Sequence, residues 1–187
     1  MFPMPGVKLT YDDLLRLPDD SLRHELIDGE HFVTPSPNTR HQRIVGQLHG
    51  ILWNWLEQNP LGEIYIAPTD VVLGPSDVVV PDLLYLSLAR AAEVLTPEAV
   101  RGMPDLIVEV LSPSTRRRDE TLKRSLYARS GVAEYWIVDP ARQAIVVHRP
   151  ASNATAIPLT LTAAQGEVLT TSLFPGLEIP LVRIFAG

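Results

Sequence analysis

The sequence predicts an α/β fold: a mixed β-sheet core flanked by helices, with an N-terminal hairpin and extra C-terminal strands. Three observations predict this class. Short β-rich apolar runs alternate with two long stretches typical of helices. A strand–helix–strand unit spans Asp105 to Val138, and such a unit is expected to form a right-handed parallel crossover. Two earlier strands are joined by the short Gly74–Asp77 turn, so at least one neighbouring pair is antiparallel.

A short helix and a hairpin are expected at the N-terminal end. Thr10 and Asp13 resemble a capping box, with Asp in place of Glu, that begins a helix ending near Leu17. Two β-rich runs, 23–27 and 30–34, flank an Asp-Gly pair, which is a favoured two-residue turn between antiparallel strands.

The first long helix is expected to begin after Asn38 or Thr39, either of which can cap it, and to continue to about Gln58. Its apolar residues recur at helical spacing and predict a stripe that faces the core. The stripe consists of Ile44, Leu48, Ile51, Leu52, Trp55 and Leu56.

The remaining elements alternate strands with two helices. The second long helix is expected to begin at Ser114 or Thr115 and to continue to about Ser130, where Gly131 ends it. Residues 88–95 form a shorter helix. The strands expected after the first long helix are 63–73, 78–86, 105–111, 134–138, 143–148, 154–161 and 168–171.

The composition is that of an ordinary globular protein. Of 187 residues, 45% are hydrophobic and 20% are charged, and this length predicts one domain, residues 1–187. The chain has no cysteine, so a metal site would use carboxylates, His, carbonyls and water. No apolar run is long enough to span a bilayer, and the N-terminal residues lack the apolar segment of a secretory signal. We therefore expect a cytoplasmic protein with no membrane partner.

The net charge of −6 argues against a broadly basic surface that coats nucleic acid. It does not exclude a nuclease, because the acids of a metal site add negative charge and a local basic patch can still contact phosphates.

Two carboxylates interrupt apolar, strand-like runs. Asp82 lies within VVVPDLLYL (78–86), and Glu109 lies within DLIVEVL (105–111). A carboxylate in such a run costs several kcal/mol unless a proton, a partner or a metal compensates it. Hard carboxylate oxygens hold hard divalent cations, which polarise a phosphate and activate water. The pair therefore favours metal-dependent phosphodiester chemistry.

The wider pattern resembles a known group of enzymes. Asp82 after Pro81, followed by Glu109 in the next core strand, resembles the PD-(D/E)XK nuclease superfamily. An ordered set of motifs, over roughly Leu9 to Phe185, resembles more specifically the Uma family of restriction endonucleases. The motifs are ELIDGE at 25–30, His41 at the start of a helix, VVPD at 79–82, EVLSPST at 109–115, Lys123, and GVAEYWIVDP at 131–140.

The resemblance implies a restriction-endonuclease-like fold in a single PD-(D/E)XK nuclease-like domain. It implies that DNA is the substrate and that Mg²⁺ or Mn²⁺ is the cofactor. Asp82, Glu109 and the main-chain carbonyl of Val110 would hold the metal by oxygen ligation. Glu25 would be a further ligand or the acid of a second metal. His41 would contact the phosphate or a water near the helix start.

The lysine departs from the superfamily pattern. The pattern has lysine two residues after Glu109, where this chain has Leu111, and the resemblance implies that its role has moved to Lys123. Geometry permits the move. At ~3.3 Å per strand residue and ~1.5 Å per helix residue, Glu109 and Lys123 lie at similar heights. Lys123 would orient the attacking water or stabilise charge on the phosphate.

Each candidate also has a purely structural interpretation. Asp82 could be a strand-end turn residue, Glu109 could pair with a buried Arg, and Lys123 could be one more solvated cation. Glu25 could face solvent and balance Arg23, and His41 could be a polar residue at a helix start. The Arg116–Arg118 run is most often a solvated first turn. Three cations there oppose the helix dipole, however, which leaves phosphate contact as an alternative.

Three functions compete. The first is a metal-dependent endonuclease, which we expect to act on duplex DNA as a homodimer or higher homo-oligomer, since one site handles one strand. The second is a non-catalytic PD-(D/E)XK-like domain that binds nucleic acid or protein. The third is a carboxylate metallohydrolase for a small phosphoester. Two metal-free carboxylates would repel each other, so we expect Ala at Asp82 or Glu109 to leave the fold intact or to stabilise it.

Overall fold

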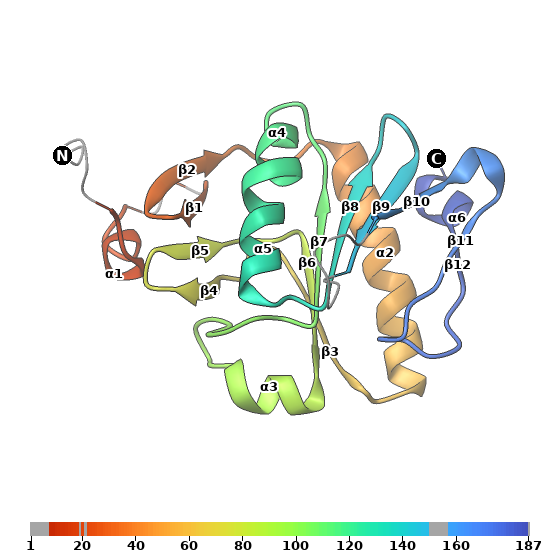
Figure 1. The fold of residues 1–187 in the computed structure, drawn as a ribbon, viewed down its shortest axis with the longest axis horizontal. Helices are drawn as coiled ribbons and strands as arrows, with labels where there is room; N and C mark the ends of the chain where they lie inside the picture. Colours follow the sequence, from red (N-terminus) through yellow and green to blue (C-terminus); the bar gives the residue numbers. More distant parts are fainter. Residues whose placement is uncertain (1–7, 19, 21, 150–156, 187) are drawn as a thin grey trace.

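Six strands form the main sheet of the protein in the order β10-β9-β8-β7-β6-β3 (Figure 1). The structure, a computed structural model, describes residues 8–18, 20, 22–149 and 157–186. Neighbouring strands of this sheet are antiparallel except β7 and β8, which are parallel, as the strand–helix–strand unit predicts. The strands are β3 (Gly62–Ile66), β6 (Leu83–Ser87), β7 (Leu106–Val110), β8 (Glu134–Asp139), β9 (Ala144–His148) and β10 (Leu159–Thr162).

A smaller sheet with the order β2-β1-β5-β4 lies beside the main sheet (Figure 1). The predicted hairpin is confirmed: β1 pairs with β2 around Asp28 and Gly29, whose positive φ values of 53° and 77° suit the tight turn. The strands are β1 (Arg23–Ile27), β2 (Glu30–Thr34), β4 (Val71–Gly74) and β5 (Asp77–Val79).

Two strands predicted as continuous are each divided between the sheets. The 63–73 run separates into β3 and β4, and the 78–86 run separates into β5 and β6. Each division contains a proline, Pro68 or Pro81, and proline lacks the N–H that a central ladder requires. The prediction of one strand through Asp82 is therefore wrong. Asp82 lies in the connection between the sheets, directly before β6.

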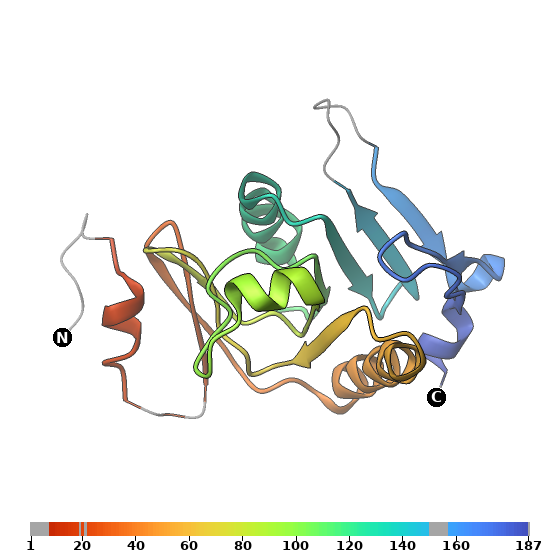
Figure 2. The same cartoon turned by 90° about the horizontal axis from the view of Figure 1, so that it is seen from below.

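Helices cover both faces of the main sheet. Figure 2 shows α2 (Thr39–Gln58) and α5 (Arg124–Ser130) on opposite sides of it. Asn38 caps α2 by accepting a hydrogen bond from the His41 N–H, and the predicted stripe of α2 packs into the core. The other α-helices are α1 (Tyr11–Leu14), α3 (Leu88–Val94), α4 (Arg116–Arg118) and α6 (Leu181–Phe185).

The second long helix is not regular throughout. The predicted 114–130 helix consists of α4, a π-helical turn η1 (Asp119–Lys123) and α5, and Gly131 ends it with a φ of 80°. A π-helical turn widens the helix locally and is frequent at functional sites. It directs both Asp119 and Lys123 into the protein, where both side chains are buried.

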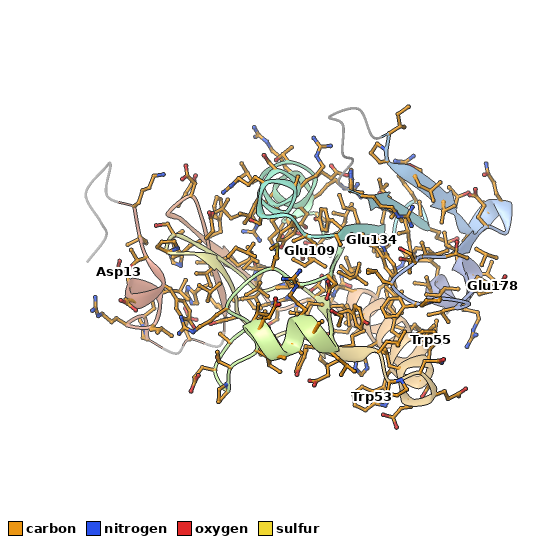
Figure 3. The ribbon with its side chains drawn as sticks, turned by 60° about the horizontal axis from the view of Figure 1, so that its bottom comes forward. Asp13, Trp53, Trp55, Glu109, Glu134 and Glu178 are labelled. Atoms are coloured by element: carbon orange, nitrogen blue, oxygen red, sulfur yellow. The ribbon has the colours of Figure 1, made fainter. Side chains whose placement is uncertain are left out.

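Alternation along β7 assigns its side chains to the two faces. Leu106, Val108 and Val110 pack with α2 in one core cluster, whereas Ile107 packs with α5 in the other. Glu109 therefore points to the same side as α5. Figure 3 shows Glu109 inside the molecule, whereas Trp53 lies at the surface on α2.

The C-terminal part contains more elements than predicted. The 143–148 strand is confirmed as β9, but part of the predicted 154–161 strand lies outside the described residues, and β10 covers Leu159–Thr162. The 168–171 strand is a short β11 (Val168–Leu169) paired with β12 (Ile179–Pro180). A 3₁₀ turn, η2 (Ala163–Gln165), and α6 were not predicted. Within the described part of the chain, no helix has the length and apolar character needed to cross a membrane.

Candidate active site

All the residues proposed from the sequence to hold the metal or act in catalysis line one cavity of about 160 Å³, here called the acidic cavity. They come from five parts of the chain: β1, the start of α2, the connection before β6, the end of β7, and η1. The proposed residues in its wall are Glu25, His41, Asp82, Glu109, Val110 and Lys123.

Strand register brings Asp82 next to Glu109. Leu83 of β6 lies opposite Val108 of β7 in an antiparallel pair. One further step along both strands places Asp82 beside Glu109, and residues directly opposite each other share a face of a sheet. The Asp82 carboxylate also accepts a hydrogen bond of 2.9 Å from the Val110 N–H, which ties the connection to the end of β7.

Lys123 reaches the same place from η1. Its ammonium lies 2.8 Å from Glu109 Oε1, 2.7 Å from Glu25 Oε1 and 3.7 Å from an Asp119 oxygen, and its side chain is only 3% exposed. Lys123 therefore lies level with Glu109, as the comparison of strand and helix lengths predicts, and it is not a solvated cation. Burial alone would lower the pKa of Lys123, but the Glu109, Glu25 and Asp119 carboxylates outweigh it and raise that pKa.

Glu25 does not face solvent. It is 1% exposed, and Oε1 accepts a 3.0 Å hydrogen bond from the Val80 N–H while Oε2 lies 3.2 Å from the Arg118 guanidinium. Period-two alternation along β1 points Arg23 and Glu25 to the same face. Arg23, however, binds Asp82 at 2.8 Å and not Glu25.

Asp82 is held by two groups besides the Val110 N–H. His41 Nε2 lies 3.0 Å from Asp82 Oδ2, and the Arg23 guanidinium donates to Oδ1. Burial opposes ionisation of Asp82, but the hydrogen bonds from His41 and Arg23 outweigh it and lower the pKa of Asp82. His41 Nδ1 is buried and has no hydrogen-bond partner among the described residues.

Repulsion between Asp82 and Glu109 is present, since the charge of Asp82 helps to raise the pKa of Glu109, but it is not the only charge interaction of this pair. Arg23 and His41 hold Asp82, and Lys123 and the Tyr127 hydroxyl, at 2.9 Å, hold Glu109 Oε1. Removing either carboxylate would therefore leave a buried cation without its partner, which is costly.

Three residues of the site were not proposed from the sequence: Arg23, Asp119 and Tyr127. Arg118 was considered there only as part of the Arg116–Arg118 run. The sequence spacing of Arg23, Asp119 and Tyr127 could have indicated that they belong to the site. Arg23 lies two residues before Glu25 on a strand, and Asp119 and Tyr127 lie four residues on either side of Lys123 on a helix, so each shares a face with its neighbour.

The Arg116–Arg118 run separates into three environments. Arg118 reaches the acidic cavity, where its guanidinium lies 5.3 Å from the centre of the Phe32 ring and also contacts Thr34. Arg116 pairs with Asp139 at 2.9 Å, and Arg117 is exposed. The three arginines therefore do not form one solvated turn, since Arg118 is mostly buried at the acidic cavity.

Burial raises the pKa of Glu109 to about 8, since Lys123 only partly offsets desolvation and the negative charges of Asp119, Asp82 and Glu25 act in the same direction as burial. Burial also raises the pKa of Asp119, one oxygen of which has no hydrogen-bond partner among the described residues. The cavity therefore holds carboxyl groups of unequal acidity, with Asp82 ionised and Glu109 mostly protonated near neutral pH.

Glu109 should make stability depend on pH in metal-free protein. Between its ordinary value of 4.5 and about 8, the folded state binds a proton that the unfolded state has released, so the free energy of unfolding falls as the pH rises. Glu109→Gln removes this contribution, which amounts to at most about 1.4 kcal/mol per pH unit. Urea unfolding at pH 5, 6.5 and 8 in EDTA measures the effect. As the pH rises, the free energy of unfolding of the variant should increase relative to that of the wild type.

The decisive quantity is the difference in the free energy of unfolding between Glu109→Gln and the wild type at each pH. Burial lowers the pKa values of His31 and His148, so these residues change stability in the opposite direction below about pH 6.5. Their contribution is the same in both proteins and cancels. Parallel pH profiles for the two proteins would show that Glu109 does not carry this proton.

The donor set of the acidic cavity suits a hard divalent cation. Four carboxylates line it against three cationic side chains. Among the described residues, one buried oxygen of Asp119 accepts no hydrogen bond, and Glu25 Oε2 has the ion pair with Arg118 but no hydrogen bond of good geometry. Within the described residues, however, no group of three or more His, Asp or Glu side chains is arranged as a metal site. The Lys123 ammonium occupies the space between Glu25 and Glu109.

Comparison with known proteins gives matches of two kinds. The family model Uma2, described as "Putative restriction endonuclease", matches residues 11–182. A crystal structure of a "putative nuclease belonging to DUF820" from Anabaena variabilis ATCC 29413 has a TM-score of 0.80 at 20% identity, and the match covers 95% of this chain and 98% of that one. At this identity the likeness shows a shared fold. No curated protein matches the chain.

Proposed function

Because the chain belongs to the Uma2 family and has its restriction-endonuclease-like fold, we propose that it is a metal-dependent endonuclease that hydrolyses DNA phosphodiester bonds. The observation that carries the proposal is the contact between Lys123 and Glu109 beside Asp82, in one cavity. Leu111, at the superfamily's lysine position, is buried in the apolar core and cannot supply a cation. Lys123 supplies it from the facing helix.

In this proposal Asp82, Glu109 and the Val110 carbonyl hold Mg²⁺ or Mn²⁺. The bound ion would supply Lewis-acid polarisation of the phosphate and a more acidic water. Lys123 orients the attacking water or offsets charge that develops on the phosphate. Glu25 is a further ligand or the acid of a second metal. His41, whose ring contacts Asp82, also contacts the phosphate or a water.

The proposal is tested by incubating supercoiled plasmid with the protein in Mg²⁺, in Mn²⁺ and in EDTA. We expect nicked and linear products with either metal and none in EDTA, because without a bound ion nothing polarises the phosphate or makes the attacking water more acidic. An intact plasmid in both metals, with protein that is folded by circular dichroism, would contradict the proposal.

A second candidate is a PD-(D/E)XK-like domain that binds nucleic acid or protein without cutting. The observation in its favour is that Lys123, Arg23 and Arg118 already neutralise the carboxylates, so the fold needs no metal to compensate them. Plasmid that is retarded in a gel but never cut, in the presence of metal, would support this candidate.

We further propose that residues 1–187 are one nuclease-like domain and that duplex cleavage uses a homodimer or higher homo-oligomer. The reason is that the described residues of a chain form one acidic cavity of this kind, and one site handles one strand at a time. Sedimentation of the protein with and without DNA would test the assembly.

A further inference from the structure

A second cavity of about 410 Å³, here called the side cavity, adjoins the acidic cavity. Arg23, His41, Asp82 and the Thr34–Pro37 segment line both, so the two cavities share part of their walls. This volume lies within the ~300–1,000 Å³ range of small-molecule sites. None of the roles proposed above uses the side cavity.

Its wall differs in character from that of the acidic cavity. Val45, Ile66, Ala67 and Pro68 supply apolar surface, and Ile66 is 46% exposed although it is a large aliphatic residue. No carboxylate other than Asp82 lines it among the residues that the structure describes. A wall of this kind suits an uncharged, flat, mostly apolar group more than a second phosphate.

Two polar groups stand at the edge of this apolar surface. The Gln42 amide is exposed on the first turns of α2, and it can both donate and accept hydrogen bonds. Arg23 lies at the boundary between the cavities, and its side chain is mostly buried while it binds Asp82. A guanidinium plane that is fixed in this way can stack on a nucleobase, and an amide can pair with the edge of a base.

We propose that the side cavity receives the base of an unpaired nucleotide next to the phosphate held in the acidic cavity. The inference rests on the proposed nuclease function and names its substrate: single-stranded DNA, or a strand with an extruded nucleotide. A phosphate at Asp82 and Glu109 places the neighbouring sugar and base at the shared wall. A base in a duplex is stacked and paired, so it cannot enter unless it leaves the helix.

Binding without cleavage tests this inference. Two fluorescein-labelled strands of the same length and charge serve as probes, one of twelve thymidylates and one with tetrahydrofuran in place of every base. Their affinities for wild-type protein are measured by fluorescence anisotropy in EDTA. We expect the base-bearing strand to bind about tenfold more tightly, the scale of burying one base against a protein surface.

A matched pair of variants locates the effect. Gln42→Trp fills the side cavity from an exposed helix position and should bring the affinity for the thymidylate strand down to that for the abasic strand. Gln47→Trp makes the same change at an exposed position of α2 that does not line the side cavity, and it should keep the tenfold ratio. Neither position belongs to the proposed catalytic machinery.

Equal affinities for the two strands in wild-type protein would overturn the inference, as would an unchanged ratio in Gln42→Trp or no binding of either strand. The assay needs no metal and no turnover. A protein that fails to cut plasmid but prefers the base-bearing strand would therefore refute the endonuclease proposal and retain the base site.

Discussion

Asp82→Ala and Glu109→Ala are each expected to reduce metal-dependent DNA cleavage to about one thousandth of the wild-type rate. Each change removes one of the two carboxylates proposed to hold the metal, and losing one group that stabilises charge in a transition state costs up to about 10³-fold. Nicking of supercoiled plasmid in Mg²⁺ at several protein concentrations measures the loss. Full activity in either variant would remove that residue from the mechanism.

Stability must be measured with activity, because the structure reverses the expectation for these alanine variants. Asp82→Ala leaves the mostly buried Arg23 guanidinium and the Val110 N–H without their acceptor. Breaking a buried pair on one side costs about 3–5 kcal/mol. The isosteric Asp82→Asn and Glu109→Gln keep an acceptor oxygen, so they should remain better folded while staying inactive.

Glu134 provides a matched control for these variants. It is a buried carboxylate on β8 that pairs with Arg149 at 2.8 Å and accepts from the Trp136 indole, and it does not line the acidic cavity (Figure 3). Glu134→Gln should lower stability without abolishing cleavage. Equal activity losses in Glu134→Gln and Glu109→Gln would show that the assay reports unfolding.

Lys123→Ala is expected to reduce turnover by about 10²-fold or more with metal binding largely retained. The ammonium is the charge-stabilising donor of the proposal, and Leu111 cannot replace it. The variant also leaves Glu25, Glu109 and Asp119 without their shared cation, so stability should fall at alkaline pH. Near pH 6 the loss should be smaller, because Glu109 then holds a proton.

Lys123→Met fills nearly the same space without the charge. It therefore separates the effect of losing the ammonium on turnover from the effect of losing the packing of the side chain. Rates under single turnover and Mg²⁺ affinity by calorimetry should show lost turnover with near-normal metal binding. Arg124→Ala is the control, because Arg124 is exposed and points about 100° away from Lys123 around the helix. A folded Lys123→Met protein with wild-type turnover would exclude the lysine from the chemistry and favour the non-catalytic candidate.

Local patterns in the chain were enough to predict several elements. The Asp28-Gly29 turn, the Asn38 cap and the Gly131 stop depend on residues that are close in sequence, and all three are present. The helical stripe of α2 and the parallel β7–β8 pair also follow from periodicity and connection length. The acids Asp82 and Glu109 stood out because carboxylates in apolar runs need compensation.

Which cations compensate Asp82, Glu109 and Glu25 was decided by tertiary structure. Arg23, Arg118 and Lys123 come from β1, α4 and η1, and their pairing with the carboxylates depends on how the small sheet and the π-helical turn pack against β7. The division of two predicted strands between sheets has the same origin. Propensity describes a residue and its chain neighbours, whereas burial and charge pairing depend on groups that only the folded chain brings together.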